Sequence, residues 1–216
     1  MTTTEQQSHK KVVTNNTTMA TWAGAIARAL RTYEVDDQRL FADAGIDHAL
    51  VNNPAQRIPV TDMTRLWNLS VAESGDPAFG LAVAQHVNLT TFHALGVAAM
   101  ASANAHEAGA LICRFASMIS DGIAMQFHHQ DNEVGLVLGM RPGYPRFADA
   151  CVEAVLASVY LIARQLVPDT YVARITLQHR CPSDPAFYQG FFACPVTFSA
   201  SSDGIYTAMG SLASAE

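Results

Sequence analysis

The longest patterned stretch of the chain spans positions 92–140, where a helical period gives way to a strand period. Its first part places apolar residues every three or four positions, as on one helix face, at Leu111, Ile112, Phe115, Met118 and Ile119. Its second part alternates around the polar pair Asp131-Asn132, with inward candidates at Ile123, Met125, Phe127, His129, Val134, Leu136 and Leu138. The pattern predicts a helix on one face of an antiparallel hairpin, which can enclose either a filled core or a pocket.

Before this stretch the pattern is helical. Apolar periodicity predicts helices at about 19–33, 37–44, 61–74 and 94–102. Asp36 and Gly45 mark the two ends of the second helix, and Asp76-Pro77 is a strong helix-start signal. Residues 1–18 show no periodicity and are rich in Thr, Asn and Gln, so we expect a disordered tail there.

After it, positions 147–167 form a long helix that is apolar on more than one side. Such a helix is either sandwiched within the fold or shared with a second copy of the chain. The candidates for a dimer contact on this helix are Val152, Leu156, Val159 and Tyr160.

The remaining pattern is of short strands. A strand is predicted at 172–179, and two brief strands at 195–198 and 205–208 are predicted to flank an Asp203-Gly204 turn. The fold class is therefore α+β, with N-terminal helices followed by a small antiparallel sheet packed against helices, in one domain over 19–216.

Composition restricts the partners. At 216 residues, half of them hydrophobic, the chain can bury the core of one domain. Its net charge is −6 and only 15% of its residues are charged. Gripping nucleic acid requires a basic face, so this part of the protein is not expected to bind DNA by itself.

The cysteines and the apolar segments indicate a compartment. Four cysteines, at 113, 151, 181 and 194, form no CxxC pair, and this usage is typical of the reducing cytosol. Residues 1–18 are polar and do not resemble a secretory signal. The segment 147–167 contains Asp149, Glu153 and Arg164, too many charges for a membrane span. We expect a cytoplasmic protein with no membrane partner.

Catalytic and metal-binding motifs do not explain the chain. It has no GxSxG, P-loop, GxGxxG after a strand, HExxH or CxxC motif. His128-His129 with Asp131 is the densest group of metal-ligand types, but adjacent strand residues point to opposite faces. Cys181 and Cys194 lack enough neighbouring ligands for a zinc site. We expect no metal, no cofactor and no catalytic residues.

The predicted pocket lies between the helix and the hairpin. Its apolar candidates are Phe92, Phe115, Met118, Met125, Phe127, Leu136 and Leu138. Candidate contacts for an acidic or hydroxyl-bearing ligand are Arg114, His129 and Tyr144. Core packing explains each apolar residue equally well, so the pattern alone does not separate a pocket from a filled core.

Several short segments are each too common to identify a protein family, but their order and spacing along the chain are informative. They are LFADAGID (40–47), RIP (57–59), RLW (65–67), SGDPAFGL (74–81), FHALGVAAMAS (92–102), HEAGALICRF (106–115), ITLQHRCPSD (175–184) and CPVTF (194–198). Taken together, over about residues 20–210, they resemble the N-terminal, arabinose-binding-domain-like sensor domain of AraC-type transcription regulators.

The resemblance implies a bacterial, two-domain regulator. Its second domain, with two helix-turn-helix units, would bind DNA in the major groove, and that domain is absent from this chain. The present domain would bind a small-molecule effector, form a homodimer, or both. The resemblance carries no effector signature that can be transferred residue by residue, so the ligand stays open.

Two other functions stay open as well. One is an oligomerisation module with a filled core and no effector, and the other is a small enzyme or metal protein. A cavity beside the hairpin favours the sensor, whereas close packing around Phe127, His129 and Leu136 favours the oligomerisation module.

Overall fold

The computed structural model describes residues 16–53, 55–130, 132–166 and 172–208. The α-helices are α1 (Thr21–Thr32), α2 (Asp37–Ala44), α3 (Val60–Ser74), α4 (Phe79–Ala84), α5 (His93–Met100), α6 (Ala105–Ile119), α7 (Asp149–Leu166) and α8 (Pro185–Phe192). Two 3-10 turns are η1 (His48–Asn52) and η2 (Leu89–Phe92). The strands are β1 (Thr17–Met19), β2 (Arg57–Pro59), β3 (Ile123–Gln130), β4 (Glu133–Met140), β5 (Val172–Thr176), β6 (Val196–Thr197) and β7 (Asp203–Ala208).

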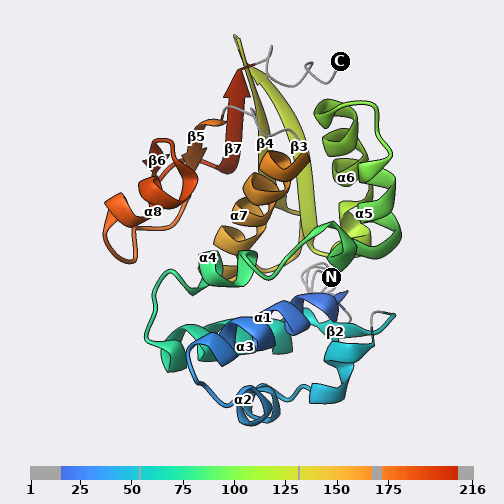
Figure 1. Cartoon of the computed structure of the whole chain (residues 1–216), viewed down its shortest axis with the longest axis vertical. Helices are drawn as coiled ribbons and strands as arrows, with labels where there is room; N and C mark the ends of the chain where they lie inside the picture. Colours follow the sequence, from blue (N-terminus) through green and yellow to red (C-terminus); the bar gives the residue numbers. More distant parts are fainter. Residues whose placement is uncertain (1–15, 54, 131, 167–171, 209–216) are drawn as a thin grey trace, which may run out of the picture.

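The helices and strands form two tiers (Figure 1). Helices α1, α2 and α3 and the antiparallel β1–β2 ribbon make one tier, and a twisted sheet with its helices makes the other. The sheet has the order β3-β4-β7-β5-β6, in which every neighbouring pair is antiparallel except β5 and β6. This arrangement confirms the predicted α+β class and the order of helices before sheet.

The β3–β4 hairpin forms as predicted. Phe127 pairs with Leu136 and Met125 with Leu138, so the alternating apolar residues of both strands share one face. Met125 and Leu136 are buried on that face, while Gln126 and His128 are exposed on the other. The period of two in the sequence thus reports the burial of one face of the sheet.

Two predictions made from the ends of the chain were wrong. The expected disordered tail over 1–18 includes Thr17 and Thr18, which belong to β1 and pair with β2; residues 1–15 lie outside the described residues. The short strands near the C-terminus do not pair around an Asp203-Gly204 turn. Instead β6 pairs in parallel with β5, and Asp203 is the first residue of β7, which lies between β4 and β5. Pairing with strands distant in sequence decided both cases.

The start of α6 confirms a predicted cap. The side chain of Asn104 accepts a hydrogen bond from the Glu107 backbone N–H at 2.9 Å. The carboxylate of Glu107 reaches back to the Ala103 N–H at 2.7 Å, one residue before the position used in a standard capping box. The regular helix is interrupted at Phe115, whose backbone has φ −109° and ψ 15°.

Arg57 connects the two tiers. Its guanidinium donates to the Thr17 hydroxyl at 2.6 Å, to the Met118 carbonyl at 2.7 Å and to the Asp121 carboxylate at 3.1 Å. Asp121 also accepts from the Thr17 backbone N–H at 2.8 Å. The β1–β2 ribbon is therefore held against the corner between α6 and β3 by charge-assisted hydrogen bonds.

Helices α4 and α7 cross at Gly80. A Cβ placed on Gly80 would overlap the backbone carbonyl oxygen of Ala150 and lie 2.9 Å from the Cβ of Glu153. Only glycine permits this approach, because the obstructing atom belongs to the backbone of α7 and cannot rotate away. The crossing fixes the depth at which α7 sits in the fold.

We expect Gly80→Ala to lower the free energy of unfolding by about 3 kcal/mol or more, since the helices must separate to admit the methyl group. Chemical denaturation followed by circular dichroism measures this. Gly190 is the matched control: it lies in α8 with nothing within 4 Å of a Cβ, so Gly190→Ala should be neutral or stabilising by up to about 1 kcal/mol. Equal effects of the two substitutions would contradict the role of the crossing.

Candidate ligand-binding site

An apolar cavity of about 120 Å³ lies between the hairpin and the helices that cover it. Its walls come from α1, η2, α5, α6, α7, β3 and β4. The lining residues are Trp22, Leu89, Phe92, Leu95, Gly96, Ala108, Gly109, Ile112, Ile119, Ile123, Met125, Leu136, Val155, Ser158, Val159, Ile162, Ala163 and Leu166. Leu166, at the end of α7, is 41% exposed, which places it at the rim.

The lining is almost free of polar groups. Among the described residues that form it, Ser158 and Trp22 have polar atoms in their side chains, and none carries a charge. The Ser158 hydroxyl donates to the Ala154 carbonyl at 2.6 Å, so its oxygen keeps lone pairs that can accept one further hydrogen bond, and the indole N–H of Trp22 is a donor. The cavity can therefore bind mainly by shape and apolar contact, with two weakly polar groups in its lining.

The η2–α5 wall is compact because the chain turns sharply there. Asn88 and Thr91 cap η2 reciprocally, and His93, at the junction with α5, has φ 49°. A Cβ on Gly96 would overlap the Leu89 carbonyl oxygen, so α5 packs directly on η2. This close packing brings Leu89 and Phe92 to the cavity together with Leu95.

Helix α7 separates the cavity from the core, which explains why its sequence is apolar on two sides. Val155, Val159 and Ile162, spaced by four and three residues, line the cavity. The opposite side packs inside the same chain, where the Tyr160 ring lies 5.4 Å from that of Phe192. Of the two alternatives for this helix, the sandwiched one describes what the structure shows.

The residues proposed for a dimer contact on α7 are mostly internal. Val152, Leu156 and Tyr160 are exposed by 3%, 0% and 3%, and Val159 lines the cavity. These side chains are already used by packing within one chain and offer almost no surface to a second copy.

Three of the ten residues predicted to bind a ligand line the cavity: Phe92, Met125 and Leu136. Leu138 is buried on the same face of the hairpin but does not belong to the lining. Phe127 instead stacks on His106 at 5.0 Å and covers Gly109, and His129 is exposed beside His106. The ring of Tyr144 packs over Gly122, outside the cavity lining.

The other three lie on α6. Arg114 and Met118 follow Ile112 by two and six positions, so the 3.6-residue period turns them away from the cavity, and Met118 is 53% exposed. Phe115 stands where the helix is interrupted and lies under the Arg114 guanidinium at 5.3 Å. The face of α6 that the sequence pattern predicted to line the pocket is therefore rotated relative to the face that lines the cavity.

The residues that sequence reasoning missed come mainly from α7 and α6, with a few from α1, η2 and α5. Leu89, Val155 and Ile162 lie far from the hairpin in sequence and meet it only in the folded chain. The sequence feature that pointed to these residues was the second apolar face of α7, because an apolar face has to be covered by other parts of the fold or by a partner.

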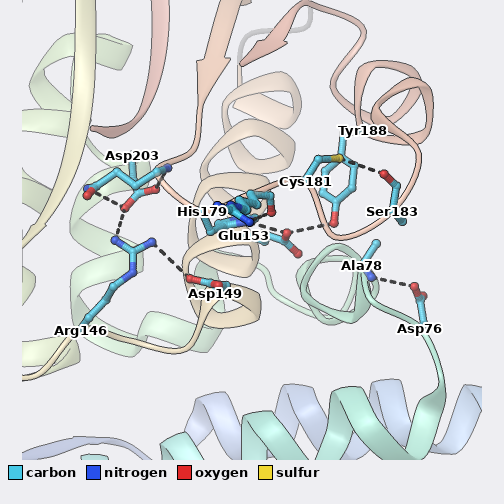
Figure 2. Close-up of polar contacts among 12 residues, drawn as sticks. Asp76, Ala78, Arg146, Asp149, Glu153, His179, Cys181, Ser183, Tyr188 and Asp203 are labelled. Carbon is cyan, nitrogen blue, oxygen red and sulfur yellow. Dashed lines mark hydrogen bonds and ion pairs between the residues drawn. The ribbon is translucent and has the colours of Figure 1, made fainter. Parts of the chain in front are cut away.

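A second unusual site is the buried carboxylate of Glu153 (Figure 2). Glu153 is 1% exposed on α7, and its Oε1 accepts a hydrogen bond from the Tyr188 hydroxyl at 2.9 Å. Nε2 of His179 lies 3.3 Å from the same oxygen, without the angles of a hydrogen bond. Oε2 of Glu153 has no hydrogen-bond partner among the described residues.

This environment disfavours the charged form of Glu153. Burial raises the pKa of its carboxyl to about 8, and the nearby negative charges of Asp149 and Asp76 add to the rise, against the opposing hydrogen bond from Tyr188. Oε2 is left without a donor, as expected for an atom that carries a proton. The carboxyl thus joins α7 to α8 largely as a neutral group near pH 7.

Metal binding and thiol chemistry have no site among the described residues. Among them, no three His, Cys, Asp or Glu side chains are grouped so that they could hold a metal ion. All four cysteines are free, and burial raises the pKa of Cys113 to about 11 and of Cys151 to about 12, which keeps both thiols protonated and poorly nucleophilic. Within the same part of the chain, none of the helices has the length and apolar character that crossing a membrane requires.

The chain therefore combines an α+β fold with an apolar cavity beside the β-hairpin, whose rim lies at Leu166. The chain belongs to the family described as the arabinose-binding domain of AraC transcription regulators, N-terminal, which it matches over residues 35–213. This confirms the family inferred from the order of the short sequence segments.

Two known proteins extend this result. An ornithine utilization regulator of Pseudomonas aeruginosa is 27% identical over 148 residues, which are 68% of this chain and 43% of that protein. The crystal structure of the transcriptional regulator CdpR from Pseudomonas aeruginosa shares the fold, with a TM-score of 0.61 at 16% identity over 87% of this chain and 55% of that one. The chain thus spans about half the length of the regulators it resembles.

We expect the stability of the chain to fall with rising pH because of Glu153. In the unfolded chain this carboxyl releases its proton near pH 4.5, whereas in the fold it holds the proton to about pH 8. Between these values the folded state binds one more proton, so its contribution is complete below pH 4.5 and is lost as pH rises toward 8. Relative to Glu153→Gln, the free energy of unfolding of the parent should fall by about 1.4 kcal/mol per pH unit in this window.

Denaturant titrations at several pH values, from 5 to 8, measure this difference. Glu73→Gln is the control: Glu73 pairs with Arg39 on the surface and its side chain is 41% exposed, so its slope against the parent should be close to zero. If Glu153→Gln also shows no slope, the carboxyl of Glu153 is ionised throughout this pH range.

Proposed function

We propose that this chain is the effector-sensing domain of an AraC-type transcription regulator, and that the effector binds in the apolar cavity between α5, α6, α7 and the β3–β4 hairpin. The observation that carries the proposal is the cavity itself, in a chain that belongs to this family of regulator domains.

The energetic cost of an empty cavity supports a ligand. Folded proteins pack their interiors to the density of organic crystals and retain few voids. At about 24 cal/mol per Å³, an empty space of 120 Å³ costs roughly 3 kcal/mol of stability. A ligand that fills this space recovers that free energy, so the domain is built to be more stable when occupied.

Helix α7 is suited to report occupancy. Val155 and Ile162 contact the cavity on one side, while Leu156 and Tyr160 pack into the core on the other. A ligand that favours one position of α7 shifts the population of the whole domain toward that arrangement. In the proposed regulator, this shift changes the geometry of an attached DNA-binding domain.

The partners follow from this role. The domain acts as a homodimer, and the burial of Val152, Leu156 and Tyr160 moves its contact surface away from that side of α7. DNA binding belongs to a second domain, in agreement with the acidic balance of this chain. The proposed regulator has no enzymatic activity and works in the bacterial cytoplasm, where its DNA lies.

An oligomerisation module without an effector is the second candidate. It is favoured by the exposed apolar residues Val97 and Met100 on α5, which are 62% and 57% exposed. The cavity has no purpose in that alternative. Occupancy of the cavity therefore separates the two functions.

We expect the purified 216-residue chain to retain a small molecule from bacterial extract, and Ala163→Met to reduce that retention at least tenfold. Ala163 lines the cavity from α7, so the longer side chain occupies the space of the ligand. Native mass spectrometry measures the fraction of the chain that carries added mass.

Ala98→Met is the matched control, because Ala98 is exposed on α5 and does not line the cavity. Ala108→Leu repeats the filling from α6, in case one variant folds poorly. If all three variants retain the molecule equally, the cavity is not the effector site.

A further inference from the structure

We propose that the ligand of this cavity is a small, uncharged, apolar molecule with the bulk of about one aromatic ring, and neither a sugar nor an amino acid. The inference rests on the proposed function, because it gives the ligand class of the same cavity. It goes against the sugar in the description of the family and the amino acid in the name of the relative.

The absence of polar partners in the described lining excludes charged and polyhydroxylated ligands. An ammonium or carboxylate group would lose its hydration without a counter-charge, because no described lining residue is charged. Each sugar hydroxyl needs a hydrogen-bond partner, and the side chains of the lining supply two at most, the Ser158 hydroxyl and the Trp22 indole N–H. An apolar molecule loses nothing on entry and gains the contacts of the surrounding aliphatic side chains.

Polar side chains close to the lining in sequence do not correct this balance. Arg164, next to Ala163, is exposed and donates to the Tyr160 hydroxyl at 3.0 Å, and His93, next to Phe92, lines a different pocket. Arg114 is exposed and lies over the Phe115 ring at 5.3 Å, and His106 is exposed and stacked on Phe127 at 5.0 Å. Neither residue belongs to the lining. The buried Glu153 is also outside it, and its hydrogen bond goes to Tyr188.

The volume sets the size of the ligand. An apolar cavity of about 150 Å³ engineered into another protein stays dry and binds benzene. The 120 Å³ found here therefore admits one aromatic ring or a short hydrocarbon chain of similar bulk. Since the Ser158 oxygen can accept one hydrogen bond, a single hydroxyl or N–H donor on the ligand is also compatible.

Thermal unfolding of the 216-residue chain in sealed capillaries tests the ligand class with a matched pair of probes. Toluene and benzoate share the ring and differ by a methyl against a carboxylate. Toluene should raise the Tm by roughly 3 to 6 °C at ten times its Kd, with a rise that saturates. Benzoate, L-arabinose and L-ornithine should leave the Tm unchanged.

The cavity variants locate the effect. In Ala163→Met and Ala108→Leu the apparent Kd for toluene should rise at least tenfold, while Ala98→Met should respond like the parent. A toluene effect that all variants keep would be general solvent action and would overturn the inference.

The outcomes separate this inference from the function it rests on. If benzoate, arabinose or ornithine raises the Tm, and Ala163→Met abolishes that rise, the cavity is an effector site for a polar ligand and only the ligand class is wrong. If the chain retains a charged or polyhydroxylated molecule from extract, the ligand class is likewise wrong and the proposed function stands. If neither the probes nor any extract molecule bind in a way that depends on Ala163, the proposed function fails together with the ligand class.

Discussion

The position of α7 is the constraint on which the rest of the structure depends, and the glycine crossing with α4 sets it. At Gly80 the two helices approach so closely that a single methyl group would collide with the backbone at Ala150. From that crossing, α7 runs past the sheet with one side in the core and the other against the cavity. Both tiers of the fold therefore meet around one helix (Figure 1).

The cavity and the buried carboxyl of Glu153 use the same helix in different ways. The cavity side of α7 is aliphatic, so a ligand there acts through contact and volume. The Glu153 carboxyl lies 3.3 Å from Nε2 of His179 and accepts a hydrogen bond from Tyr188, and this bond ties α7 to α8. A shift of α7 that accompanies ligand binding would have to keep or break these contacts, which gives the helix discrete positions rather than a continuous range.

Family membership indicates the class of protein, whereas the lining of the cavity indicates the class of ligand. The family identifies a regulator domain, and the shared fold with CdpR extends to the architecture alone at 16% identity. Neither gives the ligand, because one fold can carry different functions through the side chains of its site. The lining of this chain is apolar, and that property has to be read from its own residues.

The sequence by itself determined the class of fold, the family and most of the local structure. Periodicity located α6, the β3–β4 hairpin and the long α7, and side-chain caps such as Asn104 on α6 act over a few residues, so they can be recognised from the sequence. The tertiary structure alone decided which apolar faces meet. The periodicity could not show that the helix is interrupted at Phe115, that β7 lies between β4 and β5, or that Val155 and Met125 line the same cavity. A hydrophobic pattern records that a side chain is buried, and only long-range packing determines whether another side chain or an empty space lies opposite it.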